Sequence, residues 1–469
     1  MTAPRHRGLA LALVVGGLAP LLNTTVVNIG LHSLQNEFHV SVSSVQWVST
    51  AYLLALACVV PVMAWGQARF GSASLWIAAL VIFLVGSVAC ALSPSFEFLI
   101  GARVVQGVGG GLVLPLMMSI VMRVARDGDL ARLAFDVALA TAAAPVIGPI
   151  LGGLVLTQLG WRGVFVVTIP LCLAGVALAL AFLPDDSSTV DRPRFDRFGF
   201  LLLAPALAGL LWALSSTHRF QGVALDDHVL VPLVGGALLL AAFVAWARRC
   251  EDPLVDVRLL GRRDFAWATV TMFFIGVAMF GVVFLLPLFW QKIAGHDPLV
   301  AGLLLIPQAL GSLCARPATI ALSQRWGAGR MVVVGFALLL LGTFPLAFTS
   351  VTTSPWILGV VLFVRGVGLG TVLMPAMAVA YVGMDRHDVP HATVIMRMAQ
   401  QVGGAFGTAV LAVALGNAAM ATSAMFDRAF WWAIGLTVVG LVASLFLPRA
   451  TMDGLGAGPA PSSTDGKSG

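Results

Sequence analysis

Apolar runs recur along most of the chain, and their length constrains the fold more than any other feature of the sequence. A run of about 20 apolar residues is long enough for a helix to cross a bilayer. Hydrophobic residues fill 59% of the 469 positions and charged residues only 10%, which is more apolar surface than a soluble domain can bury. In lipid, every backbone polar group must be bonded internally, so only helices or closed barrels can span. Runs of helical length therefore predict an all-α integral membrane protein.

Hydropathy, charge and turn residues together predict about fourteen membrane helices. We expect them at residues 9–31, 45–66, 74–92, 98–121, 133–156, 164–183, 199–217, 229–247, 265–289, 299–322, 331–350, 355–380, 392–416 and 429–447. With both termini on one side, the loops of that side hold most of the 27 Lys and Arg residues. Loops rich in Lys and Arg stay in the cytoplasm, which predicts that both termini are cytoplasmic. Because this basic charge lies in loops between spans, it does not indicate nucleic-acid binding.

Three short motifs occur twice at nearly constant spacing. The pairs are Val105–Gly111 with Val364–Gly370, Arg69–Gly71 with Arg325–Gly327, and Gly148–Gly153 with Gly403–Thr408. Two parallel six-helix bundles with a substrate site between them are a recurring transporter plan. The spacing exceeds the length of six helices, so it predicts two extra helices between the bundles.

These repeats predict four regions of the chain. The N-terminal six-helix bundle is expected at 1–183 and the C-terminal bundle at 265–450, with two inserted helices in the segment 184–264. The tail 451–469 is rich in Gly, Pro and Ser. Such a composition is typical of disordered segments, so we expect a disordered cytoplasmic tail.

The motifs also carry a family resemblance. Arg103–Gly107 is similar to the arginine-glycine motif of the fourth helix of the major facilitator superfamily, and Gly148, Pro149, Gly152 and Gly153 are similar to its antiporter motif in the fifth. The chain resembles the fourteen-helix drug:proton antiporter branch (EmrB/QacA-like) over roughly residues 8–450. Further matches are Gln46-Trp47 with Tyr52, Trp161-Arg162 and Phe195–Gly199.

This resemblance implies a secondary active transporter that exports a small compound or drug by alternating access, as a proton antiporter in a bacterial inner membrane. Its expected partners are a small-molecule substrate, protons and the lipid bilayer, and a monomer is favoured. The resemblance implies no enzymatic reaction, no cofactor and no nucleic-acid partner.

The chain departs from the family pattern at three places. Asn23 stands where the first helix of such exporters usually carries an aspartate, and an amide cannot carry a proton at physiological pH. His32 replaces a proline near the end of the same helix. Ala68 stands where the loop with Arg69 and Gly71 usually has an aspartate, so the conformational latch that this loop forms in the family should be weakened.

Charged residues inside the predicted spans indicate the class of substrate. Arg103, Arg316, Arg365 and Arg397 lie within spans, and Asp136 is the one acid clearly inside one. A charge at membrane depth costs about 2.5–3.5 kcal/mol or more, so it usually faces a cavity or a partner. Arginines suit carboxylate and phosphate groups, which favours an anionic, zwitterionic or neutral amphiphile over a dication. Alternatively, Arg316, Arg397 and Asp136 reach the cytoplasmic surface.

The candidate site residues fall into three groups. Substrate binding is expected at Asn23, Thr24, Asn28, Trp47, Arg103, Gln106 and Arg365. Proton coupling is expected to involve Asp136, His32, which titrates near neutral pH, or Arg103. Conformational change is expected to use close helix contacts at small residues and a bend at the proline, that is, Gly148, Pro149, Gly152, Gly153, Arg69 and Gly71.

Two other functions stay open on the sequence. The first is a facilitator or importer of the same fold without proton coupling. The second is a multi-pass membrane enzyme or sensor that uses the His/Asp-rich segment 385–391. The spacing in that segment matches no zinc motif, and the five cysteines lie too far apart to indicate a metal or disulfide framework. We therefore expect no metal site.

Overall fold

The computed structural model describes residues 3–124, 130–183, 195–216, 227–250, 253–350, 353–384, 388–415 and 423–448. Helices and no strands occur in these ranges. The first half contains α1 (Ala3–Phe38), α2 (Val42–Val45), α3 (Trp47–Val59), α4 (Val62–Phe70), α5 (Ser72–Ala91), α6 (Phe96–Val124), α7 (Leu130–Val166) and α8 (Thr168–Phe182).

Two helices follow before the second half begins. They are α9 (Arg197–Ser216) and α10 (Asp227–Ala247), and the short 3-10 helix η2 (Val257–Gly261) precedes the next long helix. The second half contains α11 (Arg263–Lys292), α12 (Pro298–Leu303), α13 (Ile306–Trp326), α14 (Ala328–Thr343), η3 (Phe344–Phe348), α15 (Pro355–Tyr381), α16 (Val389–Leu415) and α17 (Ser423–Ser444).

Every predicted span overlaps a helix, but four of the spans are interrupted, namely 45–66, 164–183, 299–322 and 331–350. The span expected at 45–66 divides into α3 and α4 around Pro61, which has no backbone N–H to continue the helix. The span expected at 299–322 divides into α12 and α13, and a proline lies in the first turn of α13. Pro307 has no backbone N–H to donate to the carbonyl oxygen of Leu303, the last residue of α12, which explains the break.

Eleven helical segments in the described ranges are long and apolar enough to cross a membrane. One of them, Ile147–Phe182, unites two predicted spans, and the apolar helices Trp47–Val59 and Arg197–Leu210 are shorter. α7 runs through Gly160, whose φ of 66° is its non-helical point. The predicted total of fourteen spans therefore stays a prediction.

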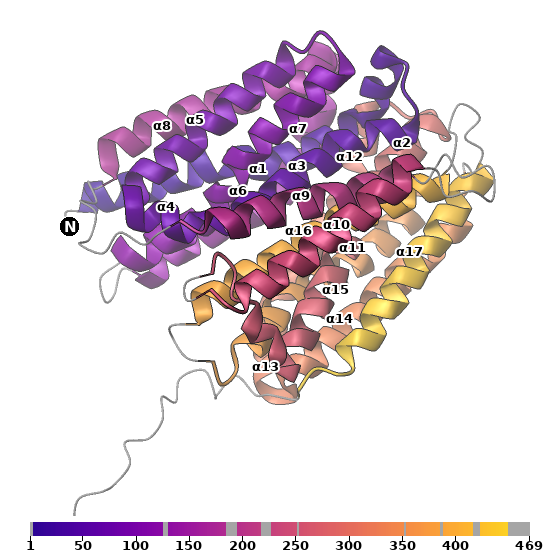
Figure 1. Ribbon diagram of the computed structural model, residues 1–469. Coiled ribbons are helices and arrows are strands. Elements are labelled where there is room, and N and C mark those ends of the chain that lie inside the picture. The colour runs from indigo at the N-terminus through magenta and orange to yellow at the C-terminus, as the bar shows by residue number, and fades with distance from the viewer. Residues whose placement is uncertain are drawn as a thin grey trace, which may run out of the picture.

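Helix packing repeats between the two halves. In the first half, α6 packs on α5 and α3, and α1 packs on α7 and α8. In the second half, α15 packs on α14 and α13, and α11 packs on α16 and α17. Figure 1 shows the indigo and violet helices of the first half in one body and the salmon to yellow helices of the second half in another. The sequence repeats thus correspond to repeated packing.

Glycine contacts repeat at the same places. A Cβ on Gly109 of α6 would lie 2.6 Å from the Ala79 carbonyl oxygen of α5. A Cβ on Gly368 of α15 would lie 2.8 Å from the Gly335 carbonyl oxygen of α14. Only glycine allows the backbones to approach this closely, so the repeated glycines hold equivalent helix pairs together.

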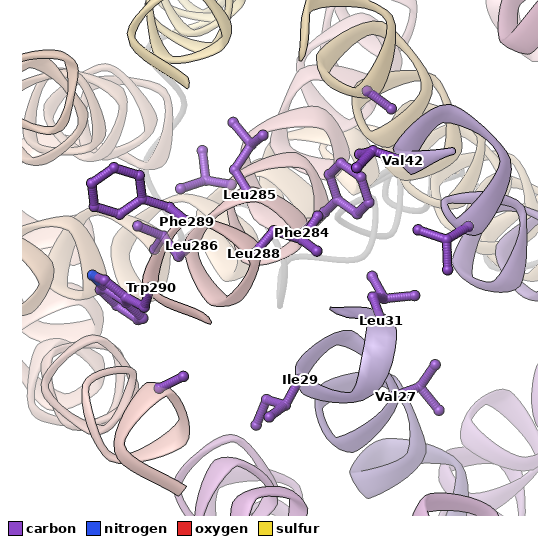
Figure 2. Close-up of a cluster of buried hydrophobic side chains, with 14 of the residues drawn as sticks. Val27, Ile29, Leu31, Val42, Phe284, Leu285, Leu286, Leu288, Phe289 and Trp290 are labelled. Atoms are coloured by element: carbon purple, nitrogen blue, oxygen red, sulfur yellow. The ribbon is translucent and has the colours of Figure 1, made fainter. Parts of the chain in front are cut away.

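The halves meet along a seam. α1 packs on α11, α3 on α16, and α7 on α12. A buried apolar cluster crosses the seam, and Figure 2 shows Val27, Ile29 and Leu31 of α1 on one side and Phe284 and Trp290 of α11 on the other. Burial of these apolar side chains stabilises the contact between the two halves toward the C-terminal ends of α1 and α11.

α9 lies across the seam. It packs on its partner α10 and also on α3 of the first half and α16 of the second, and Figure 1 shows it running between the two bodies. Asp196 holds the base of this pair of helices: Oδ1 accepts from the Gly199 N–H (2.7 Å) and Trp246 Nε1 (2.9 Å), and Oδ2 accepts from the Leu254 N–H (3.1 Å). One carboxylate thus joins the start of α9, the end of α10 and the segment leading to the second half.

Candidate functional site

Arg103 of α6 is a buried cation at the centre of the first half, with 1% of its surface exposed. Its Nε donates to the Val48 carbonyl oxygen of α3 at 2.7 Å. Its Nη1 donates to Asn23 Oδ1 of α1 at 2.6 Å and to Gln106 Oε1 at 2.5 Å. The guanidinium therefore joins α1, α3 and α6, and all three of these acceptors are neutral.

Aromatic rings cover the guanidinium of Arg103. Its Cζ lies 4.2 Å from the ring centroid of Tyr52 and 6.0 Å from that of Phe165. A ring face attracts a cation, and the attraction strengthens where water is excluded. The rings thus supply part of the stabilisation that a counter-ion would otherwise supply.

The polar network continues from Arg103 to α5 and α8. Gln106 Nε2 donates to Ser87 Oγ at 2.8 Å, and Thr168 Oγ1 donates to the same oxygen at 3.1 Å. Gln106, Ser87 and Thr168 are each 0% exposed. With the bonds of Arg103, this network connects α1, α3, α5, α6 and α8, and such a network in a water-poor interior fixes the relative positions of the helices.

Asn23 is fully buried, and its amide is only half satisfied. Oδ1 accepts from Arg103, whereas Nδ2 has no hydrogen-bond partner. A buried donor without an acceptor costs about 1–3 kcal/mol. An aspartate in this place would have no such donor, so the amide carries a cost that a carboxylate would avoid.

Arg365 of α15 is the buried cation of the second half. Its Nη1 donates to Gln308 Oε1 of α13 at 2.6 Å, its Nε to Thr343 Oγ1 of α14 at 3.3 Å, and its Nη2 to the Ala278 carbonyl oxygen of α11. Arg365 thus joins α15 to α11, α13 and α14 through neutral acceptors, as Arg103 joins α6 to α1 and α3. It is 0% exposed.

When the two sequence repeats are aligned, Arg365 is equivalent to Gln106 and not to Arg103. A Cβ on Gly86 would lie 2.5 Å from the Gln106 Cα, and one on Gly342 would lie 2.6 Å from the Arg365 Cα. Gln106 bonds the hydroxyl next to Gly86, and Arg365 bonds the hydroxyl next to Gly342. The two halves therefore hold their buried arginines at different positions of one repeated framework.

Within the described ranges, neither Arg103 nor Arg365 lies within ion-pair distance of a carboxylate. The ion pair found there is on the surface, between Arg162 Nη1 and Glu37 Oε1 at 3.7 Å. Burial of a charge without a counter-ion is costly. The two arginines therefore leave a net positive charge in the interior that the described side chains do not neutralise.

Thr24, Asn28 and Trp47 were also predicted to bind substrate. Their described contacts are with residues outside the Asn23–Arg103–Gln106 network. Asn28 Oδ1 accepts from Ser49 Oγ at 2.8 Å, and Thr24 Oγ1 donates to the Leu21 carbonyl oxygen of its own helix. Trp47 lies 5.4 Å, centroid to centroid, from Trp212 of α9. The structure therefore places the Trp47 ring at the contact with α9.

The glycines of α7 make the close contacts of this helix. A Cβ on Gly152 would lie 3.1 Å from the Val26 Cα of α1, and one on Gly148 would clash with the Thr25 side chain. Gly153 faces the Leu299 backbone of the second half. Gly302 of α12 in turn faces the Pro149 carbonyl group. Gly153 of the first half thus lies against the backbone of the second half, and Gly302 of the second half lies against the backbone of the first.

The remaining predicted residues lie elsewhere. Gly71, with φ 84°, joins α4 to α5, and Gly327, with φ 88°, has the same place before α14. Arg69 lies 6.0 Å from the Phe70 ring centroid. His32 is partly buried near Lys292. The side chain of Asp136, the side chain of Ala68 and residues 385–387 lie outside what the structure describes.

A comparison of the sequence with protein families matches residues 12–408 to the Major Facilitator Superfamily. The chain belongs to the Major Facilitator Superfamily. It is therefore a transporter with the fold of that superfamily and a multi-pass membrane protein. The predicted all-α integral membrane fold is confirmed.

Relatives among curated proteins have names that refer to drug resistance. The multidrug resistance protein B homolog of Mycobacterium tuberculosis is 36% identical over 405 residues, which cover 86% of this chain and 75% of that protein. The lincomycin resistance protein LmrB of Bacillus subtilis is 28% identical over 464 residues, covering 94% and 96%. These members of the superfamily match this chain over most of their length.

Solved structures of other transporters share the fold at low sequence identity. A D-xylose–proton symporter aligns with a TM-score of 0.68 at 15% identity, covering 94% of this chain and 98% of that chain. A POT family transporter in complex with 5-aminolevulinic acid also aligns with a TM-score of 0.68 at 15% identity, covering 94% and 96%. The agreement extends along nearly the whole transporter and concerns the fold alone.

Several residues of the network were not predicted from the sequence. Ser87, Thr168, Gln308 and Thr343 are single polar residues in apolar helices. Their signal was weak, because hydroxyl groups in membrane helices often bond their own backbone. The spacing of Ser87 and Thr343, which occupy equivalent places in the repeat, was the one clue to their shared role.

Proposed function

We propose that this transporter exports small amphiphilic compounds, drugs among them, by alternating access. The observation that carries the proposal is the buried contact between Asn23 and Arg103, which lies among α1, α3 and α6 without a described carboxylate. Relatives named for multidrug and lincomycin resistance support export of drugs.

The charge of the interior supports an anionic, zwitterionic or neutral substrate. Arg103 and Arg365 are buried, and Arg316 and Arg397 are partly exposed within the helices α13 and α16. A carboxylate or phosphate would neutralise such a charge through paired hydrogen bonds, whereas a dication would be repelled. The proposed binding residues are those of the Asn23–Arg103–Gln106 network together with Arg365.

We further propose the architecture of the fourteen-helix branch for this transporter. Residues 1–183 and 265–450 would move as two bundles about the seam, with the pair α9 and α10 between them. Gly153 against Leu299 and Gly302 against Pro149 would be the contacts that separate when that end opens. The proposed location is a bacterial inner membrane, with both termini cytoplasmic and the monomer as the working unit.

Proton antiport is the proposed source of energy, and Asn23 restricts how it could work. An amide next to Arg103 cannot release a proton at physiological pH, so the carriers would be Asp136 or His32. The combined substitutions Asp136→Asn and His32→Gln should abolish accumulation driven by a pH gradient and leave downhill flux intact. Accumulation that survives both changes would place the carrier elsewhere.

An uncoupled facilitator is the second candidate. The neutral amide of Asn23 beside Arg103 favours it. If the neutral amide at position 23 has removed coupling altogether, substrate would move only down its own gradient. A membrane enzyme or sensor that uses segment 385–391 receives no support from the family or its named relatives.

Reconstituted transport separates these functions. Proteoliposomes that contain the purified protein are loaded with a fluorescent amphiphile. The flux of the amphiphile is measured with and without an imposed pH gradient. Accumulation that requires the gradient supports the antiporter. Equal flux under both conditions supports the facilitator, and the absence of flux above protein-free liposomes would contradict both.

A further inference from the structure

Arg397 of α16 is a partly exposed arginine with few partners. Its Nη1 donates to Gln400 Oε1 at a distance of 3.3 Å, and Gln400 Nε2 in turn lies 3.9 Å from the sulfur of Met279 in α11. No described carboxylate lies within ion-pair distance of Arg397. A guanidinium has five N–H donors, and among the described residues one of them is bonded, to Gln400, which leaves donors that a ligand could use.

The surroundings of Arg397 come from three helices of the second half. The hydroxyl groups of Tyr381 in α15 and Thr393 in α16 are 2.9 Å apart. Arg397 lies one turn beyond Thr393 on the same side of α16, and its charge is close enough to Tyr381 to interact with it. α15 and α16 both pack on α11. Arg397 thus lies where α11, α15 and α16 converge.

One face of α16 leads from Arg397 toward the first half. Arg397, Gln401 and Thr408 are spaced at one and three helical turns, so they share this face. Thr408 Oγ1 lies 3.2 Å from Thr50 Oγ1 of α3, so the face turns to the first half. Thr408 is 1% exposed and Gln401 9%, whereas Arg397 is partly exposed. Exposure along this face therefore increases from Thr408 toward Arg397.

Gln401 provides a second, independent indication of a ligand. Its side chain is buried, and its Oε1 has no hydrogen-bond partner. Buried polar atoms in native proteins are nearly always paired, so an unpaired one requires an explanation. A ligand that donates an N–H or O–H group to Oε1, next to a negative group on Arg397, would satisfy both residues.

We propose that Arg397 and Gln401, with Tyr381, bind the charged head group of a small anionic or zwitterionic amphiphile that is not a bilayer phospholipid. A carboxylate or phosphate would accept two hydrogen bonds from the Arg397 fork. An adjacent N–H or O–H of the same molecule would donate to Gln401 Oε1. That this molecule is the transported substrate rests on the proposed function, whereas its binding at equilibrium does not require transport.

The test measures binding of three probes that share one ring system. Equilibrium dialysis compares 1-naphthoate, 1-naphthalenemethanol and 1-naphthylmethylamine on the full-length protein in phosphatidylcholine nanodiscs, with empty nanodiscs subtracted. We expect Arg397→Gln to weaken 1-naphthoate binding about tenfold or more, since bonds to a charged group are lost. Binding of the uncharged alcohol should stay unchanged, and Arg397→Lys should recover part of the loss.

The matched control is Arg330→Gln, which removes an exposed arginine from α14 of the same half. It should leave 1-naphthoate binding within twofold of the unsubstituted protein. The thermal unfolding midpoint of each variant is measured in parallel, so that a folding defect is seen directly. If Arg397→Gln does not fold, the comparison of Arg397→Lys with the unsubstituted protein decides, because a lysine keeps the charge and loses the bidentate geometry.

Three results would overturn the proposal. The first is no binding of 1-naphthoate by the unsubstituted protein. The second is an equal loss of acid and alcohol binding in Arg397→Gln, which indicates a structural role. The third is displacement of 1-naphthoate when phosphatidylglycerol is included in the nanodiscs, which assigns the arginine to a lipid head group. Failure of transport in proteoliposomes would overturn the proposed function and leave this binding result standing.

Discussion

The amide oxygen of Asn23 lies 2.6 Å from Nη1 of Arg103, and both side chains are buried. The contact joins α1 to α6 inside the first half. It satisfies one hydrogen bond of the guanidinium without neutralising its charge. A single nitrogen in place of a carboxylate oxygen thus decides whether this position can exchange protons.

Asn23→Asp should make transport more dependent on the pH gradient. The new carboxylate would lie beside Arg103 and would give the first helix a group that gains and loses a proton. Drug accumulation in proteoliposomes, measured over a range of imposed gradients, checks this. Asn36→Asp, at an exposed position of the same helix, is the control. Identical pH dependence in all three proteins would show that position 23 has no part in coupling.

Arg103→Ala should abolish transport and lower stability. The change leaves three buried acceptors, on Val48, Asn23 and Gln106, without their donor, at a cost of about 1–3 kcal/mol each. Arg103→Lys should recover little, because an ammonium group cannot reach three acceptors in the plane of a guanidinium.

Thermal unfolding and transport assays measure both effects. Arg330→Ala removes an exposed arginine and serves as the control. Transport at the unsubstituted rate by Arg103→Ala would contradict the central role of this side chain.

Gly302→Ala and Gly153→Ala should each weaken closure of the seam. A Cβ on Gly302 would meet the carbonyl group of Pro149, and one on Gly153 would meet the backbone of Leu299. Overpacking of this kind typically costs about 1–3 kcal/mol, and 1.4 kcal/mol corresponds to tenfold in the equilibrium between closed and open forms.

Spin labels at two exposed sites on opposite sides of the seam, Asn36 and His296, report its opening by electron paramagnetic resonance. Both glycine variants should shift the distance distribution to longer values. Gly435→Ala, where a Cβ meets open space, should not. An unchanged distribution in Gly302→Ala would mean that this contact does not control the seam.

Asp196→Ala should destabilise the pair α9 and α10. The carboxylate accepts three hydrogen bonds, from Gly199, Trp246 and Leu254. Loss of a cap and of bonds to a charged acceptor should lower the free energy of unfolding by about 2 kcal/mol or more. Asp264→Ala, at an exposed position in the first turn of α11, is the control for loss of an acid. Equal unfolding midpoints for the two variants would remove Asp196 from this role.

The positions of the helices could be predicted from the sequence, because lipid demands long apolar runs and the chain supplies them. The close contacts at the glycines of α6 and α7 could also be anticipated, because small residues permit close packing of helices. The acceptors of Arg103, by contrast, are known only from the structure: the Val48 carbonyl oxygen and two side-chain amides.

Other features depend on tertiary contacts that hydropathy does not register. The break between α12 and α13 follows from a proline that the apolar pattern conceals. The contact of Trp47 with Trp212 brings together two segments that lie far apart in sequence. The equivalence of Gln106 and Arg365 was visible in the aligned repeats, but its meaning required the hydroxyl partners Ser87 and Thr343.

Transport of a charge series tests the central claim most directly, namely that the arginine-rich interior selects for negative or uncharged amphiphiles. Inside-out vesicles that contain the protein receive 1-naphthoate, 1-naphthalenemethanol or 1-naphthylmethylamine, and uptake is followed by the ring fluorescence against vesicles that contain Arg103→Ala. The account predicts protein-dependent uptake of the acid or the alcohol and none of the amine. Protein-dependent uptake of the amine would contradict it.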